Sequence, residues 1–325
     1  MPIDGPMWSF YYQPYIVDGK EGAISVFKNH HCFADGASSI SMALAVSSEY
    51  DRSYFVGSGD VPYMLRIFTR LSFPFMIPYL IYDALRIKKD DNFLTKNKEN
   101  LTGKVNCTSC SDLLLKDIKN LSKKVGVTIN DLVTAAISMS LQRLLKEHGE
   151  TPNQVQICIP ANVRFEFYPT REEVKLENKF AAIPLKLPLF DNMEKAYSSI
   201  AYLMKRNVRE NYLAVYASYA SAFYSNMILP RTISRRVVDQ VTPQFLLAFS
   251  NVPGPIKPMY YENPEKTIKY YCVRSNSFFN CAGKVGLSIV CLSFCESFTI
   301  GITSDDNVMD KETNSKFCRY VQECL

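Results

Sequence analysis

The sequence lacks several features that would place it in a specialised class. Like charges form no block long enough to act as a nucleic-acid-binding arm, although the net charge is +5. The opening residues MPIDGPMWSFYY lack the basic start and apolar run of a signal peptide. No internal repeat and no nucleotide-binding fingerprint stands out. What remains is an ordinary globular composition, 47% hydrophobic over 325 residues, which can bury a large core.

No uncharged run in the sequence is long enough to cross a membrane. The nearest candidate is segment 61–87, where Arg66 and Arg70 interrupt one end and Pro74 and Pro78 interrupt the middle. Its aromatic and aliphatic composition, followed by basic residues, is typical of a segment that lies on a membrane surface. A buried pair of helices broken by proline has the same composition, so both interpretations stay open.

Cysteine occurs ten times, but not at the density of a disulfide framework. A chain of this length can stabilise itself by burial, so we expect mostly buried thiols in a reducing compartment. Cys107 and Cys110 form the only C-x-x-C, with no second pair and no histidine at metal-ligand spacing. The sequence therefore predicts neither a zinc site nor a redox site.

Two strand-like runs near the start, MWSFYYQPYIV and AISVFKN, flank DGKEG and predict a hairpin. Its second strand leads to His30 and His31. The following stretch, GASSISMALAVSSEY, predicts a helix that starts just after Asp35 and is capped by Ser38 or Ser39. A strand, a sharp turn and a helix together form a good place for exposed chemistry.

The rest of the chain mixes helices and strands. Residues 90–110 are polar and predict a linker. Two helices are predicted after it: the first is capped by Ser111 and ends at Gly126, and the second ends at Gly149. Strands are predicted at QVQICIP, KFAAIPLKLPL, QFLLAFSNVPGP, KYYCVRSNSFFNC, KVGLSIVCLSF and SFTIGITSD, with one or two helices over 192–226 and a terminal helix from about Asp310. This mixture predicts an α/β protein of two lobes, each with a mixed sheet.

The stretch KNHHCFADGASS contains two of the three histidines of the chain. Adjacent residues on a strand point to opposite faces, so His30 and His31 are not expected to hold one metal together. A single histidine near a carboxylate such as that of Asp35 can accept a proton at neutral pH. Taken alone, however, the stretch favours the plainer interpretation, in which backbone groups satisfy both histidines.

Further motifs reverse that preference. NHHCFADG carries the H-H-x-x-x-D-G pattern of acyltransferases with the chloramphenicol-acetyltransferase-like fold, which include the condensation domains of peptide synthetases. INDLVTAAISMSLQRLL resembles the N-D-V-V-L-A helix of the wax ester synthase/diacylglycerol acyltransferase (WS/DGAT) family, and LLAFSNVPGP resembles its S-N-V-P-G-P element. CIPANVR, ENKFAAIPLKLP and the terminal strand pair are similar to other motifs of that family in order and spacing. The resemblance extends from about GPMWSF to the C-terminus.

The resemblance implies a two-lobed, coenzyme A-dependent acyltransferase fold with mixed sheets and an incomplete first lobe. Members carry on the order of a hundred further residues before the histidine strand, about the size that a lobe needs to close a core. We therefore expect residues 1–105 to be a remnant of the first lobe and residues 106–325 to be the second. A truncated gene model, a fragment or an alternative start would each explain the difference, and each would expose sheet edges and apolar surface.

The resemblance also assigns roles to residues of the histidine motif. It makes His31 the general base, with His30 less important. Asp35 is expected to form a structural ion pair with Arg164 of CIPANVR, and Gly36 to permit the turn that opens the helix.

Other motif residues are expected to support the site. In the family a solvent channel runs between the two lobes. The resemblance places Asn251, next to Ser250, near this channel, where it could stabilise an oxyanion or the backbone around it. Asn130 and Asp131 open a helix, and either capping or function explains them. For Asn162 and Asn178, too, a local structural role and a functional role both stay open.

The implied reaction moves a fatty acyl group from acyl-coenzyme A, as a cosubstrate, to a long-chain alcohol or diacylglycerol. No cofactor, metal or nucleic acid is expected. By analogy the protein would contact the cytosolic face of the endoplasmic reticulum or lipid droplets peripherally. Two alternatives stay open: a condensation-type acyltransferase that uses a carrier-bound acyl donor, and a truncated, inactive paralogue that binds lipid or a partner.

Overall fold

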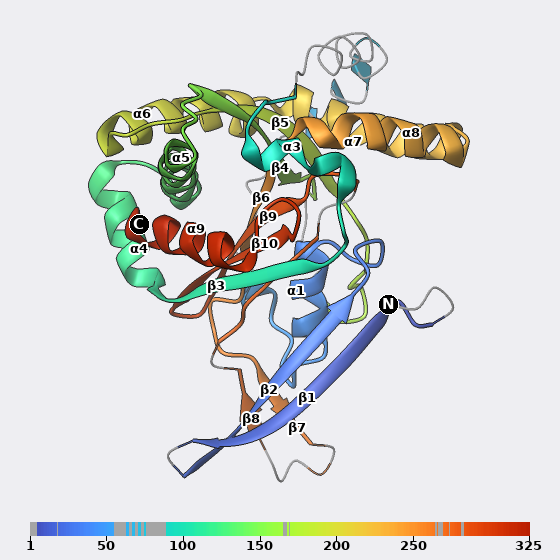
Figure 1. Ribbon diagram of the computed structural model, residues 1–325. Coiled ribbons are helices and arrows are strands. Elements are labelled where there is room, and N and C mark those ends of the chain that lie inside the picture. The colour runs from blue at the N-terminus through green and yellow to red at the C-terminus, as the bar shows by residue number, and fades with distance from the viewer. Residues whose placement is uncertain are drawn as a thin grey trace.

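The computed structural model shows the protein as a central sheet with helices around it and a hairpin that projects from it (Figure 1). It describes residues 5–17, 19–54, 63–64, 67–68, 71–72, 75, 89–164, 168, 170–263, 265, 269–272, 274–280 and 283–325. Most of segment 61–87 lies outside the described residues, so both of its interpretations, membrane contact and buried helices, stay predictions. Within the described range, no helix combines the length and apolarity that crossing a membrane requires.

Six strands form the central mixed sheet. In spatial order they are β3 (Val105–Leu114), β10 (Ser297–Asp305), β9 (Leu287–Phe294), β6 (Leu247–Pro253), β4 (Gln154–Asn162) and β5 (Phe180–Pro188). β6 runs parallel to both β4 and β9, and the other pairs are antiparallel. The inner strand β9 is buried almost throughout, whereas the edge strand β5 alternates between buried and more exposed residues, as expected for central and edge positions.

Four helices pack together on one side of this sheet, at the left of the view in Figure 1: α4 (Leu115–Val125), α5 (Ile129–Glu147), α6 (Met193–Met204) and α9 (Lys311–Glu323). Helix α5 begins with a capping box between Thr128 and Asp131 and ends before Gly149, which adopts a positive φ of 74°. Its apolar face forms the centre of the main core with the strands. The predicted helices at these places are confirmed.

Two hairpins lie at the lower end of the view in Figure 1. The first, β1 (Trp8–Val17) and β2 (Lys20–Asn29), is the one predicted from sequence, and Gly19 in its turn has a φ of 71°. Aromatic side chains of β1, including Trp8 and Phe10, are about half exposed. The second is the short pair β7 (Tyr260–Glu262) and β8 (Lys269–Tyr271). In the described part of residues 1–104, β1–β2 is the only sheet, so the mixed sheet belongs to the later part of the chain.

The remaining elements are short helices and a helical projection. A π-helix over Lys205–Arg209 separates α6 from α7 (Tyr212–Ile228), and α8 (Arg231–Val241), which the sequence patterns did not predict, follows. The single-turn helices cover Arg52–Tyr54, Lys98–Asn100 and Thr242–Gln244.

The predicted linker over 90–110 is wrong in part. Its residues form α3 (Phe93–Lys96), a single helical turn and the first half of β3. Lys98 is fully buried and its ammonium donates to the carbonyl oxygens of Phe245 and Leu246, so polar contacts fix this segment together with Leu94, which lies in the main core. Ser111 lies in β3, and α4 begins only at Leu115 with Leu114 at the cap position, so the predicted start of this helix is wrong.

Two further expectations are corrected. The predicted strand over 269–281 is a strand only at Lys269–Tyr271. Residues 274–280 instead lie across the central sheet, where Thr299 Oγ1 donates to the Ser275 carbonyl (3.1 Å) and Ser288 Oγ donates to the Phe279 carbonyl. The proposed lobe boundary between residues 105 and 106 falls at the start of β3 and stays a prediction.

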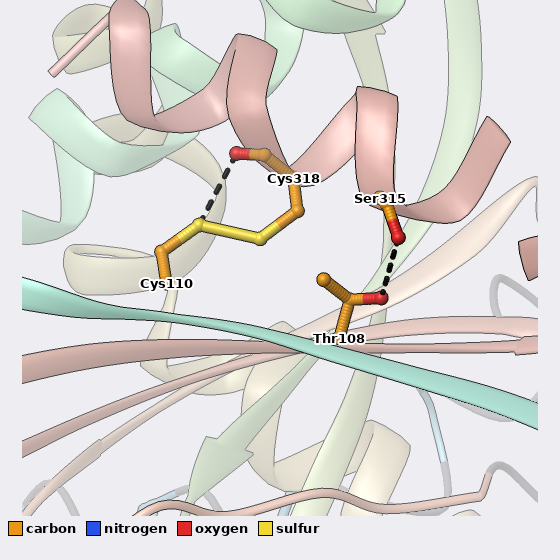
Figure 2. Close-up of a disulfide and its surroundings, with 4 residues drawn as sticks. All are labelled: Thr108, Cys110, Ser315 and Cys318. Carbon is orange, nitrogen blue, oxygen red and sulfur yellow. Dashed lines mark hydrogen bonds between the residues drawn. A yellow bond between two sulfur atoms is a disulfide. The ribbon is translucent and has the colours of Figure 1, made fainter. Parts of the chain in front are cut away.

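The cysteines also differ from the prediction. Cys110 and Cys318 are joined in a disulfide between β3 and α9, and Figure 2 shows Thr108, two residues before Cys110, bonded to Ser315 of the same helix (3.5 Å). Cys107 lies an odd number of residues from Cys110, so the C-x-x-C pair points to opposite faces of the strand. Among the free cysteines that the structure describes, only Cys291 is buried. No group of three or more potential metal ligands forms among the described residues.

Candidate functional site

His31 occupies the turn between β2 and α1 (Gly36–Ala45), and its side chain is exposed. Its Nδ1 lies 3.1 Å from Oδ1 of Asn178, and Nδ2 of Asn178 donates to the His31 carbonyl oxygen (2.8 Å). The second bond fixes the orientation of the amide, so its oxygen faces the ring and Nδ1 must carry the hydrogen. In the neutral ring, Nε2 is then left with the lone pair of a proton acceptor.

Two aromatic rings flank the imidazole. Phe180, the first residue of β5, and Phe279, from the segment across the sheet, make edge contacts with centroid distances of 6.0 Å and 6.4 Å. The ring of His31 is thus open to solvent but bordered by apolar walls from two distant parts of the chain. An alkyl chain next to the ring would meet these walls.

His30 has a different environment. Its Nδ1 accepts the backbone N–H of Cys32 (3.2 Å), and the backbone N–H of His30 donates to the carbonyl of Met7 (2.8 Å). These bonds hold the turn between strand and helix. Since the side chain of His30 binds Cys32 and that of His31 binds Asn178, the two histidines do not converge on one metal position.

Behind the turn lies a buried ion pair, the one expected between Asp35 and Arg164. Arg164 Nη1 lies 2.8 Å from Asp35 Oδ2, and the two side chains are 3% and 7% exposed. The same carboxylate accepts the backbone N–H groups of Ser38 (2.9 Å) and Lys179 (2.8 Å). Asp35 is therefore the cap of α1, in place of the predicted Ser38 or Ser39, and it also ties the helix to the residues that precede β5.

Arg164 extends this network in the other direction. Its Nη2 donates to Ser38 Oγ and to the carbonyl of Glu177, both at 2.9 Å. Asn162 Oδ1 accepts from the Arg164 backbone N–H (3.0 Å), so Asn162 holds the arginine in place. Burial alone would lower the pKa of Arg164, but the hydrogen bond and charge of Asp35 outweigh it and leave the pKa raised.

The structure gives a steric reason for glycine at position 36. Its φ lies outside the left-handed region, so the turn itself does not demand glycine. A Cβ at this position would lie 2.8 Å from Cγ2 of Val252 in β6. The start of α1 therefore packs directly against the SNVPGP strand, and this close approach excludes a side chain.

The other predicted residues lie deeper along the sheet and helix. Asn251 Nδ2 donates to Asn130 Oδ1 (2.8 Å), which joins β6 to the start of α5 rather than leaving the amide aimed at an oxyanion. Asp131 is buried, completes the capping box of α5 and pairs with Arg209 at 2.6 Å, so its capping role explains it. Ser250 lies in β6 opposite Val290 of β9.

The structure thus gathers five of the predicted residues around one turn: His31, Asp35, Asn162, Arg164 and Asn178. Asn130 and Asn251 form a separate pair. Asp131 lies in the cap of α5, where it also pairs with Arg209. Sequence reasoning missed the two phenylalanines. Phe180 is the last residue of the ENKF stretch that contains Asn178, and could have been noticed there. Phe279 lay inside a run interpreted as a strand, so no signal indicated its position.

The chain is similar to several known proteins in sequence and in fold. Residues 176–325 match the family model described as the WS/DGAT C-terminal domain. The O-acyltransferase WSD of Acinetobacter baylyi is 23% identical over 160 residues, which cover 48% of this chain and 33% of that protein. A Mycobacterium tuberculosis protein named "Probable diacyglycerol O-acyltransferase" is 20% identical over 325 residues, covering 94% of this chain and 68% of that one. The chain thus aligns with only a third of the first relative.

The solved wax ester synthase/diacylglycerol acyltransferase from Marinobacter aquaeolei VT8 is similar in structure. It superposes with a TM-score of 0.55 at 18% identity and covers 100% of this chain, which in turn spans 71% of that structure. At this identity the likeness shows the fold. The predicted fold class, a mixed α/β fold like that of the coenzyme A-dependent (chloramphenicol-acetyltransferase-like) acyltransferases, is confirmed.

Proposed function

We propose that this chain is an O-acyltransferase of the WS/DGAT family, since residues 176–325 match the model of that family's C-terminal domain and the similar proteins are named O-acyltransferases. The proposed reaction transfers a fatty acyl group from acyl-coenzyme A, as a cosubstrate, to the hydroxyl of a long-chain alcohol or of diacylglycerol. The names of the similar proteins support the reaction class. The single observation that carries the proposal is the exposed His31 ring, with Nδ1 bonded to Asn178 and with the rings of Phe180 and Phe279 beside it.

The proposed mechanism needs no covalent acyl-enzyme. His31 Nε2 accepts the proton of the acceptor hydroxyl while its oxygen bonds to the thioester carbonyl carbon. Collapse of the tetrahedral intermediate breaks the carbon–sulfur bond, and the imidazolium returns the proton to the thiolate, which yields the ester and free coenzyme A. Asn178 keeps the ring in the required tautomer, as the partner of a catalytic histidine does. Phe180 and Phe279 would border the acyl or alcohol chain near the reacting carbon.

The proposed partners are lipids and a lipid surface. The acceptor in this proposal is barely soluble in water, so the enzyme would meet it at the cytosolic face of the endoplasmic reticulum or on lipid droplets, through peripheral contact.

The test is ester formation by the purified chain from radiolabelled palmitoyl-coenzyme A with hexadecanol or dioleoylglycerol in detergent micelles. His31→Ala should lower kcat by about 10²–10⁴-fold, the usual contribution of a general base. Asn178→Ala should lower it by about tenfold, because one hydrogen bond of the ring is lost. The matched control is His30→Ala, which should retain most activity; wild-type kcat in the His31 variant would refute the role.

The same assay distinguishes the alternatives. A carrier-bound acyl group used in preference to acyl-coenzyme A would indicate the condensation-type reaction. Absence of ester from every donor, in a chain that is folded, would instead indicate a non-catalytic protein that binds lipid or a partner.

A further inference from the structure

Helix α8 is an element with almost no packing against the rest of the described chain. It follows α7 and extends away from the sheet at the right of the view in Figure 1. None of its eleven residues is buried. A helix of this length is marginal in water without packing, so an element that covers one of its faces is to be expected.

The residues of α8 divide into two halves. At 100° per residue, Ile233, Val237, Val238 and Val241 fall on one side, which we call the apolar face of α8. Ile233, Val237 and Val238 are 45%, 47% and 39% exposed. Ser234 also falls on the apolar side, and its hydroxyl oxygen is buried. The other half holds three arginines, an aspartate, a threonine and a glutamine.

The end of α7, which precedes α8 in the chain, also carries exposed apolar side chains. All seventeen residues of α7 are uncharged, and near its end Phe223 and Met227 are 49% and 69% exposed. A soluble protein rarely leaves side chains of this size together at a projecting edge unless something covers them.

The charge pattern indicates which partner covers this surface. Arg235 pairs with Asp239 along the helix (3.8 Å), so the excess positive charge comes from Arg231 and Arg236. Long basic side chains beside a half-exposed apolar face are typical of helices that lie in the headgroup region of a membrane. Their charge complements anionic headgroups, and their alkyl stems can reach up from a helix that is partly immersed.

Helix α7 also connects this surface to the candidate site. Ser218 Oγ donates to the carbonyl of Ala182 in β5 (2.8 Å), two residues from Phe180, which contacts His31. The hydroxyl of Tyr216 donates to the carbonyl of Val163 (3.2 Å), next to Arg164. One helix thus runs from the strand beside the site to the exposed apolar surface.

We infer that the apolar face of α8, together with Phe223 and Met227, docks on the surface of an anionic phospholipid bilayer. The inference rests on the peripheral membrane contact in the proposed function and assigns it to specific residues. Docking would set β5 and the His31 side of the molecule next to the lipid from which a lipophilic acceptor comes. It requires no turnover, so binding and catalysis can be measured separately.

The test is co-sedimentation of the full chain with sucrose-loaded vesicles of phosphatidylcholine, with and without 30% phosphatidylserine (about 0.1 M salt). We expect binding to the mixed vesicles that weakens as salt is raised. The double variant I233Q/V237Q should bind at least tenfold more weakly, because each side chain loses an apolar transfer worth about one factor of ten. R231Q and R236Q should each weaken binding to mixed vesicles about fivefold and leave binding to neutral vesicles unchanged.

Thr232→Gln, on the polar half of α8, is the matched control and should bind like the wild type. Circular dichroism of each variant confirms that the chain is folded, and ester formation in detergent micelles should be unaffected by I233Q/V237Q, so loss of activity and loss of binding are distinguished. Wild-type binding by I233Q/V237Q would overturn the inference. So would a dimer of the wild type, detected by light scattering and abolished by I233Q/V237Q, because the apolar face would then cover a second copy of the chain.

Discussion

Replacing Arg164 by methionine is expected to destabilise the protein strongly while His31 itself stays unchanged. The substitution leaves Asp35 buried without its counter-charge, and a buried ion pair that loses one partner costs about 3–5 kcal/mol of unfolding free energy. Asp35→Ala should cost a similar amount, because it strands the guanidinium and removes the cap of α1. Domain stabilities are about 5–15 kcal/mol, so either loss is a large fraction of the total.

The decisive measurement is a double-mutant cycle by urea unfolding. With both charges removed, D35A/R164M contains no stranded ion, so it should be destabilised by at least about 2 kcal/mol less than the sum of the two single variants. The backbone groups of Ser38, Glu177 and Lys179 still lose partners, so the double variant should remain less stable than the wild type. Additive single effects would refute the reasoning, because they would mean that solvent or other groups satisfy each charge separately.

Three further predictions concern close approaches and a helix cap. Gly36→Ala should lower kcat and thermal stability, because its Cβ would meet Val252 at 2.8 Å, and adding Val252→Ala should restore much of both. Gly301→Ala would place a Cβ 2.2 Å from the carbonyl oxygen of Ser277, so it should displace the segment across the sheet and lower kcat more than it lowers the melting temperature. Asp310→Ala removes the cap of α9 and should cost about 1 kcal/mol at neutral pH, measured by urea unfolding.

Each of these has its own control. For Gly36, failure of the Val252 change to help would show that something other than this contact excludes the side chain. For Gly301, a lower melting temperature with an unchanged kcat would contradict displacement of the segment beside the site.

The Asp310 prediction is tested through pH. Hydrogen bonds from the backbone and side chain of Thr313 lower the pKa of Asp310 in the folded state. Its stabilisation should therefore be complete above the unfolded pKa and vanish as pH falls through the lowered folded value. A difference between wild type and variant that persists unchanged below pH 2 would contradict the assignment.

Much of the fold could be predicted from sequence because its signals are local. Helix α5 carries its own cap, apolar face and stop, and the hairpin β1–β2 carries its own turn. Segment 90–110 could not be predicted in the same way. Its order depends on bonds from Lys98 to carbonyl groups about 147 residues away, and no periodic pattern encodes such contacts.

The site shows the same division. The motif indicated His31, Asp35 and Arg164, and the ion pair has the expected partners. It did not indicate that Gly36 is needed because of Val252, nor that Phe279 lies beside the ring, since both facts depend on how distant strands stack. The motif placed Asn251 near an oxyanion or the backbone around it, but it did not indicate that the amide of Asn251 bonds to Asn130.

The bonds around the histidine turn link residues that are far apart along the chain. His31 and Asn178 are separated by 147 positions, and Asp35 and Arg164 by 129. At ribosomal rates, the interval between synthesis of His31 and of its partner is about 7–30 s. During that time the ring has no fixed tautomer and the carboxylate has no counter-ion. An N-terminal fragment that stops before β5 should therefore contain the complete histidine motif and yet have no ordered site.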